Sequence, residues 1–100
     1  MTDKYKLNDD HSISECNDVI EWGKAFESVN RKVAETEVGD ARISTVFIGL
    51  DHSFGNGDPL LFETMIFGGP RDDHMRRYAT WDDALIGHHE MVATERKMQE

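Results

Sequence analysis

The sequence predicts an α+β fold, with a three- to four-stranded antiparallel sheet on which an N-terminal and a C-terminal helix pack. Apolar residues recur at helical spacing near both ends of the chain. Two runs in the middle, 41–50 and 60–67, are rich in β-branched and aromatic residues. Segments of Gly, Asn, Asp and Pro separate these runs. A sheet covered by helices is the arrangement that buries such elements.

The N-terminal region predicts a flexible tail followed by a helix. Residues 1–12 are polar, as untethered chain ends often are. Residues 14–30 have the spacing of a short amphipathic helix. The apolar residues expected on its buried face are Val19, Ile20, Trp22, Phe26 and Val29.

The middle of the chain predicts the sheet. Segments 31–37 and 41–50 flank a short Gly-Asp turn and form a hairpin. Segment 60–67 pairs antiparallel with 41–50, and 76–79 adds a short edge strand. Because 41–50 is apolar on both faces, either both faces are covered, or one face is covered and the other exposes apolar residues that favour association. Glu63 interrupts its strand, and we expect it on the solvent side.

The C-terminal helix begins at Trp81, after Thr80 as the N-cap. Asp83 lies in its first turn, where negative charge is favoured. His88 falls on the apolar face, and we expect it to pack there with its ring nitrogens hydrogen-bonded. The adjacent His89 points about 100° away and is expected in solvent.

Length and charge limit the function. One hundred residues suit a single domain, 1–100. The net charge of −9 disfavours direct binding to nucleic acid, which needs clustered Lys and Arg, and favours a basic partner. No apolar run suits a membrane helix or a secretory signal, so we expect a cytoplasmic protein. The single cysteine, Cys16, leaves no internal disulfide, and no cofactor is expected.

The loop 51–58 between the two apolar strands is the segment most suited to chemistry or binding. Its Asp and Asn residues could simply stabilise turns. In the chemical interpretation, Asp51 orients His52 as a base, or side chains of the loop hold a divalent metal together with His74. The candidate ligands are Asp51, His52, Asp58 and His74. Phe54 would contribute to a binding surface instead.

Acidic residues gather near the N-terminal helix. They are Asp9, Asp10, Glu15, Asp18, Glu21 and Glu27. Such a patch can imitate a row of phosphates and occupy the basic channel of a nucleic-acid-binding protein, or it can be a solvated face. The residues expected to bind a partner are Asp18, Glu21, Glu27, Asp51, His52, Phe54 and Asp58.

Three strings carry a resemblance to known proteins: 43–52 (ISTVFIGLDH), 59–69 (PLLFETMIFGG) and 78–81 (YATW), the last followed by Gly87 and His88. Over 31–92 the chain resembles a group of small proteins encoded in bacteriophage and prophage genomes. The resemblance implies an accessory role in the cytoplasm of an infected bacterium and supplies no catalytic residues. By analogy, small acidic phage proteins are often inhibitors of host machinery, including anti-CRISPR and other anti-defence proteins.

The favoured hypothesis is therefore a non-enzymatic protein that binds and inhibits a host protein or ribonucleoprotein complex with a basic surface. Steric occlusion or charge mimicry would be the mechanism. One alternative is a small metal-dependent or His-based hydrolase that uses the loop 51–58. The other is an oligomeric structural phage protein, a homodimer through a strand edge or a sheet face.

Overall fold

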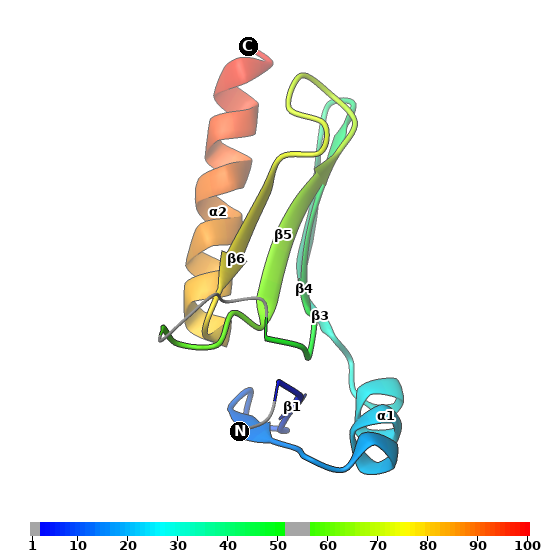
Figure 1. Ribbon diagram of the computed structural model, residues 1–100. Helices are drawn as coiled ribbons and strands as arrows, with labels where there is room; N and C mark the ends of the chain where they lie inside the picture. Colours follow the sequence, from blue (N-terminus) through cyan, green and yellow to red (C-terminus); the bar gives the residue numbers. More distant parts are fainter. Residues whose placement is uncertain (1–2, 52–56) are drawn as a thin grey trace.

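The computed structural model describes residues 3–51 and 57–100. Within them, short strands precede the first helix, and a four-stranded sheet precedes the second (Figure 1). The elements are β1 (Tyr5–Leu7), β2 (Ile13–Glu15), α1 (Val19–Ser28), β3 (Lys32–Val38), β4 (Ala41–Phe47), β5 (Phe62–Phe67), β6 (Met75–Tyr78) and α2 (Trp81–Met98). This is the predicted α+β class.

The sheet has the order β3-β4-β5-β6, and every neighbouring pair is antiparallel. Both the β3–β4 hairpin and the pairing of 41–50 with 60–67 are thus confirmed. The hairpin turns at Gly39, whose φ of 57° belongs to the left-handed region that glycine adopts readily. Thr45 lies directly opposite Thr64, which fixes the register of the two central strands.

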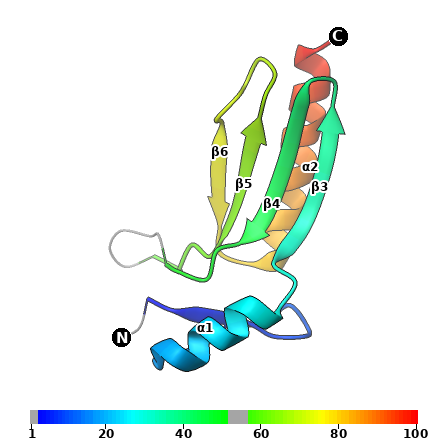
Figure 2. The same ribbon diagram turned by 90° about the vertical axis from the view of Figure 1, so that its right-hand side faces the viewer.

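Helix α2 covers one face of the sheet, and the opposite face is open in Figure 2. Its start is the predicted one, because the Thr80 hydroxyl accepts a hydrogen bond from the Asp83 amide at 3.1 Å. Gly87 lies against the ring of Tyr78, which leaves no room for a Cβ there. Neither helix in the described ranges has the length and hydrophobicity needed to cross a bilayer.

The core beneath α2 consists of two apolar clusters with a polar layer between them. One cluster lies near the start of α2 and contains Leu7, Phe47, Leu61, Phe62, Tyr78 and Ala84. The other lies toward the end of α2 and contains Val38, Ala41, Ile43, Ile66, Met91 and Val92. The layer between them is formed by Thr36, Thr45, Thr64 and His88.

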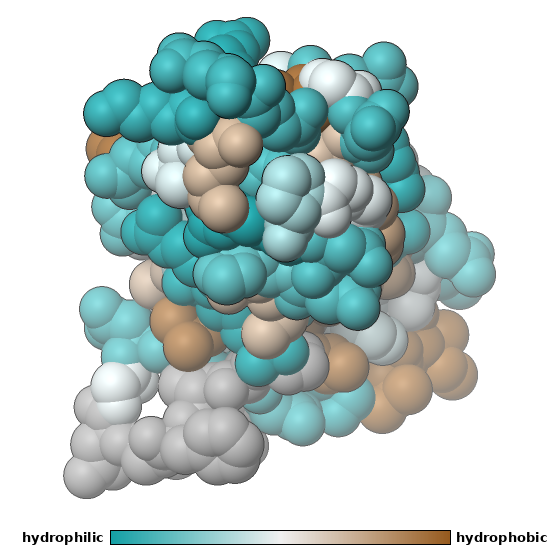
Figure 3. Space-filling model, turned by 90° about the horizontal axis from the view of Figure 1, so that it is seen from above, coloured by the Kyte–Doolittle hydropathy of each residue, from teal (hydrophilic) through white to brown (hydrophobic). Residues whose placement is uncertain are grey.

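The open face of the sheet is crossed by ion pairs. Glu63 lies there beside Arg77, with 3.1 Å between Oε2 and Nε, so the prediction that Glu63 faces the solvent side is confirmed. Glu35 pairs with Arg42 at 3.0 Å. The end of the molecule at the top of Figure 1, near the C-terminus, is mostly hydrophilic (Figure 3).

Residues 3–12, expected to belong to a flexible tail, instead form most of a hairpin. Strand β1 pairs antiparallel with β2, and Asn8 closes the turn by donating its amide to the Ser12 carbonyl at 2.8 Å. At the turn, His11 stacks on Trp81 with 3.6 Å between ring centroids. Burial of Leu7 and this stack tie the segment down, as happens when a chain end finds tertiary partners.

Helix α1 does not pack on the face of the sheet, contrary to the prediction for the N-terminal helix. It begins at Val19 and not near residue 14, and it packs beside β1 at the end of the sheet where β4 finishes (Figures 1 and 2). Phe26 provides the link, with its ring centroid 6.3 Å from that of Phe47. Of the two helices in the described ranges, α2 alone therefore covers the sheet.

Candidate functional site

The ends of the loop 51–58 are held by the backbone. Asp51 accepts a hydrogen bond from the Leu60 amide at 3.0 Å through its carboxylate, and its own amide donates to the Asp3 carbonyl at 2.8 Å. The Asp51 carboxylate therefore links the two ends of the loop, in agreement with the interpretation that the acidic residues of this loop stabilise turns. Asp58 is exposed. His52 and Phe54 lie outside the described residues.

His74 cannot share a metal ion with Asp51 or Asp58, so the predicted four-residue ligand set is wrong in this respect. His74 precedes β6, and its carbonyl accepts from the Ile66 amide near the end of β5, whereas residues 51 and 58 lie between β4 and the start of β5. The intervening strand, Phe62–Phe67, spans about 17 Å at ~3.3 Å per residue. Within 3–51 and 57–100, no group of three or more His, Cys, Asp or Glu residues could hold a metal ion.

His88 is fully buried and has a structural role, as predicted. Its Nδ1 lies 2.7 Å from the Thr45 hydroxyl and its Nε2 lies 2.9 Å from the Thr36 hydroxyl. Burial lowers the pKa of His88, and the neighbouring His89 lowers it further. The ring is therefore neutral at pH 7, with one nitrogen donating and the other accepting. His89 is exposed, also as predicted.

A shallow cleft of about 620 Å³ runs beside β6. Arg76, Arg77 and Tyr78 form one wall, and α2 forms the other. Asp58 also lines the cleft, so one loop residue predicted to bind a partner does reach a surface hollow.

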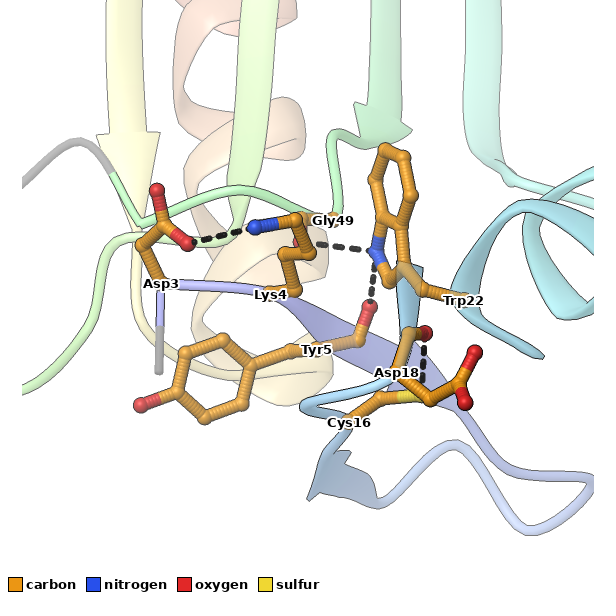
Figure 4. A network of polar contacts seen from close by, with 7 residues as sticks. All are labelled: Asp3, Lys4, Tyr5, Cys16, Asp18, Trp22 and Gly49. Carbon is orange, nitrogen blue, oxygen red and sulfur yellow. Dashed lines mark hydrogen bonds and ion pairs between the residues drawn. The ribbon is translucent and has the colours of Figure 1, made fainter. Parts of the chain in front are cut away.

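Helix α1 is attached to the rest of the molecule by Trp22. The indole N–H donates to the Tyr5 carbonyl at 2.9 Å and to the Gly49 carbonyl at 3.2 Å, so it joins α1 to β1 and to the chain after β4 (Figure 4). Beside it, the Cys16 thiol lies 3.8 Å from the Asp18 carbonyl. Trp22 and Phe26 stack with centroids 5.2 Å apart. The two aromatic residues thus fix the inner side of α1.

The outer side of α1 carries exposed aliphatic side chains. Val19 is 62% exposed and Ile20 is 71% exposed, which contradicts their predicted place on the buried face. At 100° per residue, Ile20 points about 160° away from Trp22, whose indole is anchored inward. Val19 is the first residue of the helix. Ile20 also lines a shallow hollow of about 650 Å³, together with Glu21, Lys24 and Ala25. We call Val19, Ile20 and the carboxylates around them, Glu15, Asp18, Glu21 and Glu27, the α1 surface.

The carboxylates of the α1 surface are all exposed. Asp18 also has a structural task, because it caps the helix by accepting from the amides of Ile20 and Glu21 at 2.9 and 3.0 Å. Glu21 makes an open ion pair with Lys6 at 3.5 Å. Such exposed pairs contribute little and exchange readily with a partner's cations. Lys24 is the one base of α1.

The chain matches no protein-family model, no curated protein and no solved structure. Geometry is therefore the basis for choosing among the surfaces. The α1 surface brings together Asp18, Glu21 and Glu27 from the predicted binding set and adds Val19 and Ile20, which sequence reasoning placed inside. The missed signal was the angle on the helical wheel, which separates Ile20 from Trp22 by about 160°.

Proposed function

We propose that this chain is a non-enzymatic phage accessory protein that binds a basic surface of a host macromolecular complex through the α1 surface and blocks it. The observation that carries the proposal is the exposure of Val19 and Ile20 on an acidic helix. The resemblance of 31–92 to phage and prophage proteins supports a host complex as the partner. Occlusion of that surface, or imitation of its phosphate ligand, would be the inhibitory mechanism.

The aliphatic residues support a docking role because they are mostly exposed and contribute little to the core. Helix α1 is held by Trp22 and Phe26 on its inner side. Polar side chains at 19 and 20 would leave those contacts intact. Burial of one large aliphatic side chain in a complex contributes roughly 1.5–3 kcal/mol. Two adjacent ones beside a hollow can therefore anchor a partner.

The carboxylates support a basic partner. Asp18 and Glu21 line the hollow with Ile20, Glu27 lies further along the same helix, and Glu15 precedes it. Only Lys24 on α1 opposes them. Charges at the rim of an interface raise the association rate and select the partner, whereas the apolar centre supplies affinity. Added salt should therefore lower the association rate of the complex. Substitution of Val19 and Ile20 should raise its dissociation rate.

A matched pair of charge reversals tests the electrostatic part. Glu21→Lys with Glu27→Lys changes the α1 surface, and Glu37→Lys with Glu100→Lys changes exposed carboxylates elsewhere. Each pair alters the net charge by the same amount, from −9 to −5. Tagged chains are used to capture proteins from a bacterial lysate, which are identified by mass spectrometry. A partner retained by the second pair and lost by the first supports the proposal.

The apolar part is tested with the captured partner in purified form. Val19→Ser with Ile20→Ser should weaken binding at least about tenfold while leaving thermal unfolding unchanged, because both side chains are exposed. Met98→Ser, at a residue 51% exposed on α2, is the control. Asp18→Asn removes one charge and keeps the cap. Binding that is independent of salt and survives both pairs of substitutions in α1 would reject the proposal.

A further inference from the structure

Strand β6 is an edge of the sheet with backbone groups directed outward. The carbonyls of His74 and Tyr78 accept hydrogen bonds from the Ile66 and Leu61 amides, each at 2.9 Å. In an antiparallel ladder the residues of one strand alternate between its two sides. The amides and carbonyls of Met75 and Arg77 therefore point away from β5. Among residues 3–51 and 57–100, no strand lies beyond them.

One flank of α2 overhangs this edge. Asp83, Ile86 and Glu90 follow the i, i+3, i+7 spacing of a single helix face and line the cleft beside β6. Ile86 is 59% exposed, so an aliphatic side chain stands in solvent directly beside the outward edge. The cleft is therefore a slot. The backbone edge of β6 forms one side, and on the other side the aliphatic side chain of Ile86 lies between the carboxylates of Asp83 and Glu90.

The charges of the slot are predominantly negative. Asp58, Asp83 and Glu90 line it together with Arg76 and Arg77, and Arg76 makes a loose ion pair with Glu90 at 3.4 Å. Arg77 is engaged on the open face of the sheet with Glu63. A partner strand fits this row of side chains when its basic residues meet Asp83 and Glu90 and an aliphatic residue between them meets Ile86.

We infer that β6 accepts an extended peptide segment of another protein as a fifth strand. The segment has the pattern basic-x-aliphatic-x-basic, because side chains of a strand alternate between faces and those of one face must meet Asp83, Ile86 and Glu90. Main-chain hydrogen bonds to Met75 and Arg77 supply affinity, and the slot supplies specificity. This binding is independent of the α1 surface.

A second copy of the chain is not the occupant. Antiparallel pairing of two β6 strands about a two-fold axis would bring Arg76 and Arg77 of one copy against the same residues of the other. Like charges directly opposite each other destabilise a strand pair. Arginines on this edge thus oppose self-pairing, as charged residues on natural edge strands do.

The test uses fluorescein-labelled peptides and the full chain. The probe is GKTITKG with blocked ends, and GTKKITG, with the same composition and charge but without the alternation, is its control. We expect a Kd of about 100 µM for the probe and binding at least about tenfold weaker for the control. N-methylation of the peptide's alternate backbone amides that face β6 should abolish binding. N-methylation of the intervening amides, which face away from β6, should not.

Variants of the chain locate the peptide. Arg77→Pro removes the outward amide, and a proline is tolerated at an edge whose amide faces solvent. Arg77→Ala loses the same ion pair but keeps the amide. We expect loss of binding for Arg77→Pro and for Ile86→Ser, and retention for Arg77→Ala, with folding checked by thermal unfolding. Chemical-shift changes at the Met75 and Arg77 amides of the unaltered chain give the same information should Arg77→Pro not fold.

Several results would overturn the inference. The first is no binding of GKTITKG at about 1 mM, and the second is equally tight binding of the control peptide. The third is equally tight binding of the probe by Arg77→Pro and Arg77→Ala. The fourth is that the unaltered chain is a dimer and that Arg77→Pro abolishes the dimer. Loss of lysate partners in the α1 variants, with peptide binding unchanged, would separate this site from the α1 surface.

Discussion

Nδ1 of His88 lies 2.7 Å from the hydroxyl oxygen of Thr45, and this contact joins α2 to the centre of the sheet. Thr45 also bonds to Thr64 on the next strand, and Thr36 meets the other ring nitrogen. The four side chains form a buried polar layer between two apolar clusters. Sliding β4 by two residues would oppose these hydroxyls to apolar groups, so the layer favours one register.

The stability of the protein should fall as the pH falls from 7 toward 5. Burial lowers the pKa of folded His88, whereas the unfolded chain titrates near 6.5. Below that value the unfolded state binds the proton more readily, so the free energy of unfolding decreases with a slope of at most about 1.4 kcal/mol per pH unit. Urea unfolding across this range measures it.

His88→Gln provides the comparison for the pH experiment. It lowers stability at every pH, because it disturbs a fully buried position, but it removes this titration. The pH slope between 7 and 5 should therefore be smaller in His88→Gln than in the unaltered chain. Equal slopes would mean that His88 does not carry the effect.

Two glycines in helices should respond to alanine in opposite directions. A Cβ at Gly23 meets nothing within 4 Å, so Gly23→Ala should raise the free energy of unfolding by about 0.5–1 kcal/mol. A Cβ at Gly87 would overlap ring atoms of the buried Tyr78. Overpacking there outweighs helix propensity, so Gly87→Ala should lower stability by about 1–3 kcal/mol. Thermal unfolding decides both signs.

Trp22→Phe tests the attachment of α1. It keeps an aromatic ring beside Phe26 and removes the donor to the Tyr5 and Gly49 carbonyls. Loss of this one donor, which two carbonyls share, should cost about 1–2 kcal/mol in the free energy of unfolding. Trp81→Phe, which alters the stack on His11, should cost less. Urea unfolding followed by circular dichroism compares the two, and equal losses would contradict the bracing role.

Glu95→Met should stabilise the protein. Glu95 is fully buried, and its Oε2 has no hydrogen-bond partner in the described part of the chain, although Oε1 accepts from the Gln99 side chain at 3.1 Å. Gln99 keeps its bond to the Val38 carbonyl in the variant. Replacing a poorly paired buried carboxyl by an apolar side chain of similar volume is worth roughly 1–2 kcal/mol at pH 7. A lower midpoint in urea would show that the carboxyl is stabilising.

The sheet and α2 could be predicted because their sequence signals agree with their tertiary roles. Segments 41–50 and 60–67 carry long β-branched runs, and Thr80 stands before a helical repeat. The hairpin of β1 and β2 could not be found this way. Its strands have three residues each and mostly polar side chains. What holds them is contact with distant parts of the chain, such as the stack of His11 on Trp81.

Prediction of the candidate site was partial for a related reason. Composition located the acidic residues near α1, but the exposure of Ile20 depends on which side of the helix is anchored by Trp22. Likewise, Asp58 and His74 are both close to β5 in the sequence, yet the strand separates them. Residue types can be read from the sequence, but the distance between Asp58 and His74 follows only from how β5 pairs with its neighbours.

The hydrogen bond from the Tyr5 amide to the Gly49 carbonyl, at 2.9 Å, also has a bearing on biosynthesis. During translation the first strand emerges well before its acceptor, and the stack of His11 awaits residue 81. The β1–β2 hairpin therefore cannot make all of its final contacts until Trp81 has been synthesised. The contacts that orient the acidic helix run from Trp22 to the Tyr5 and Gly49 carbonyls, so α1 cannot dock before the chain that follows β4 has been synthesised.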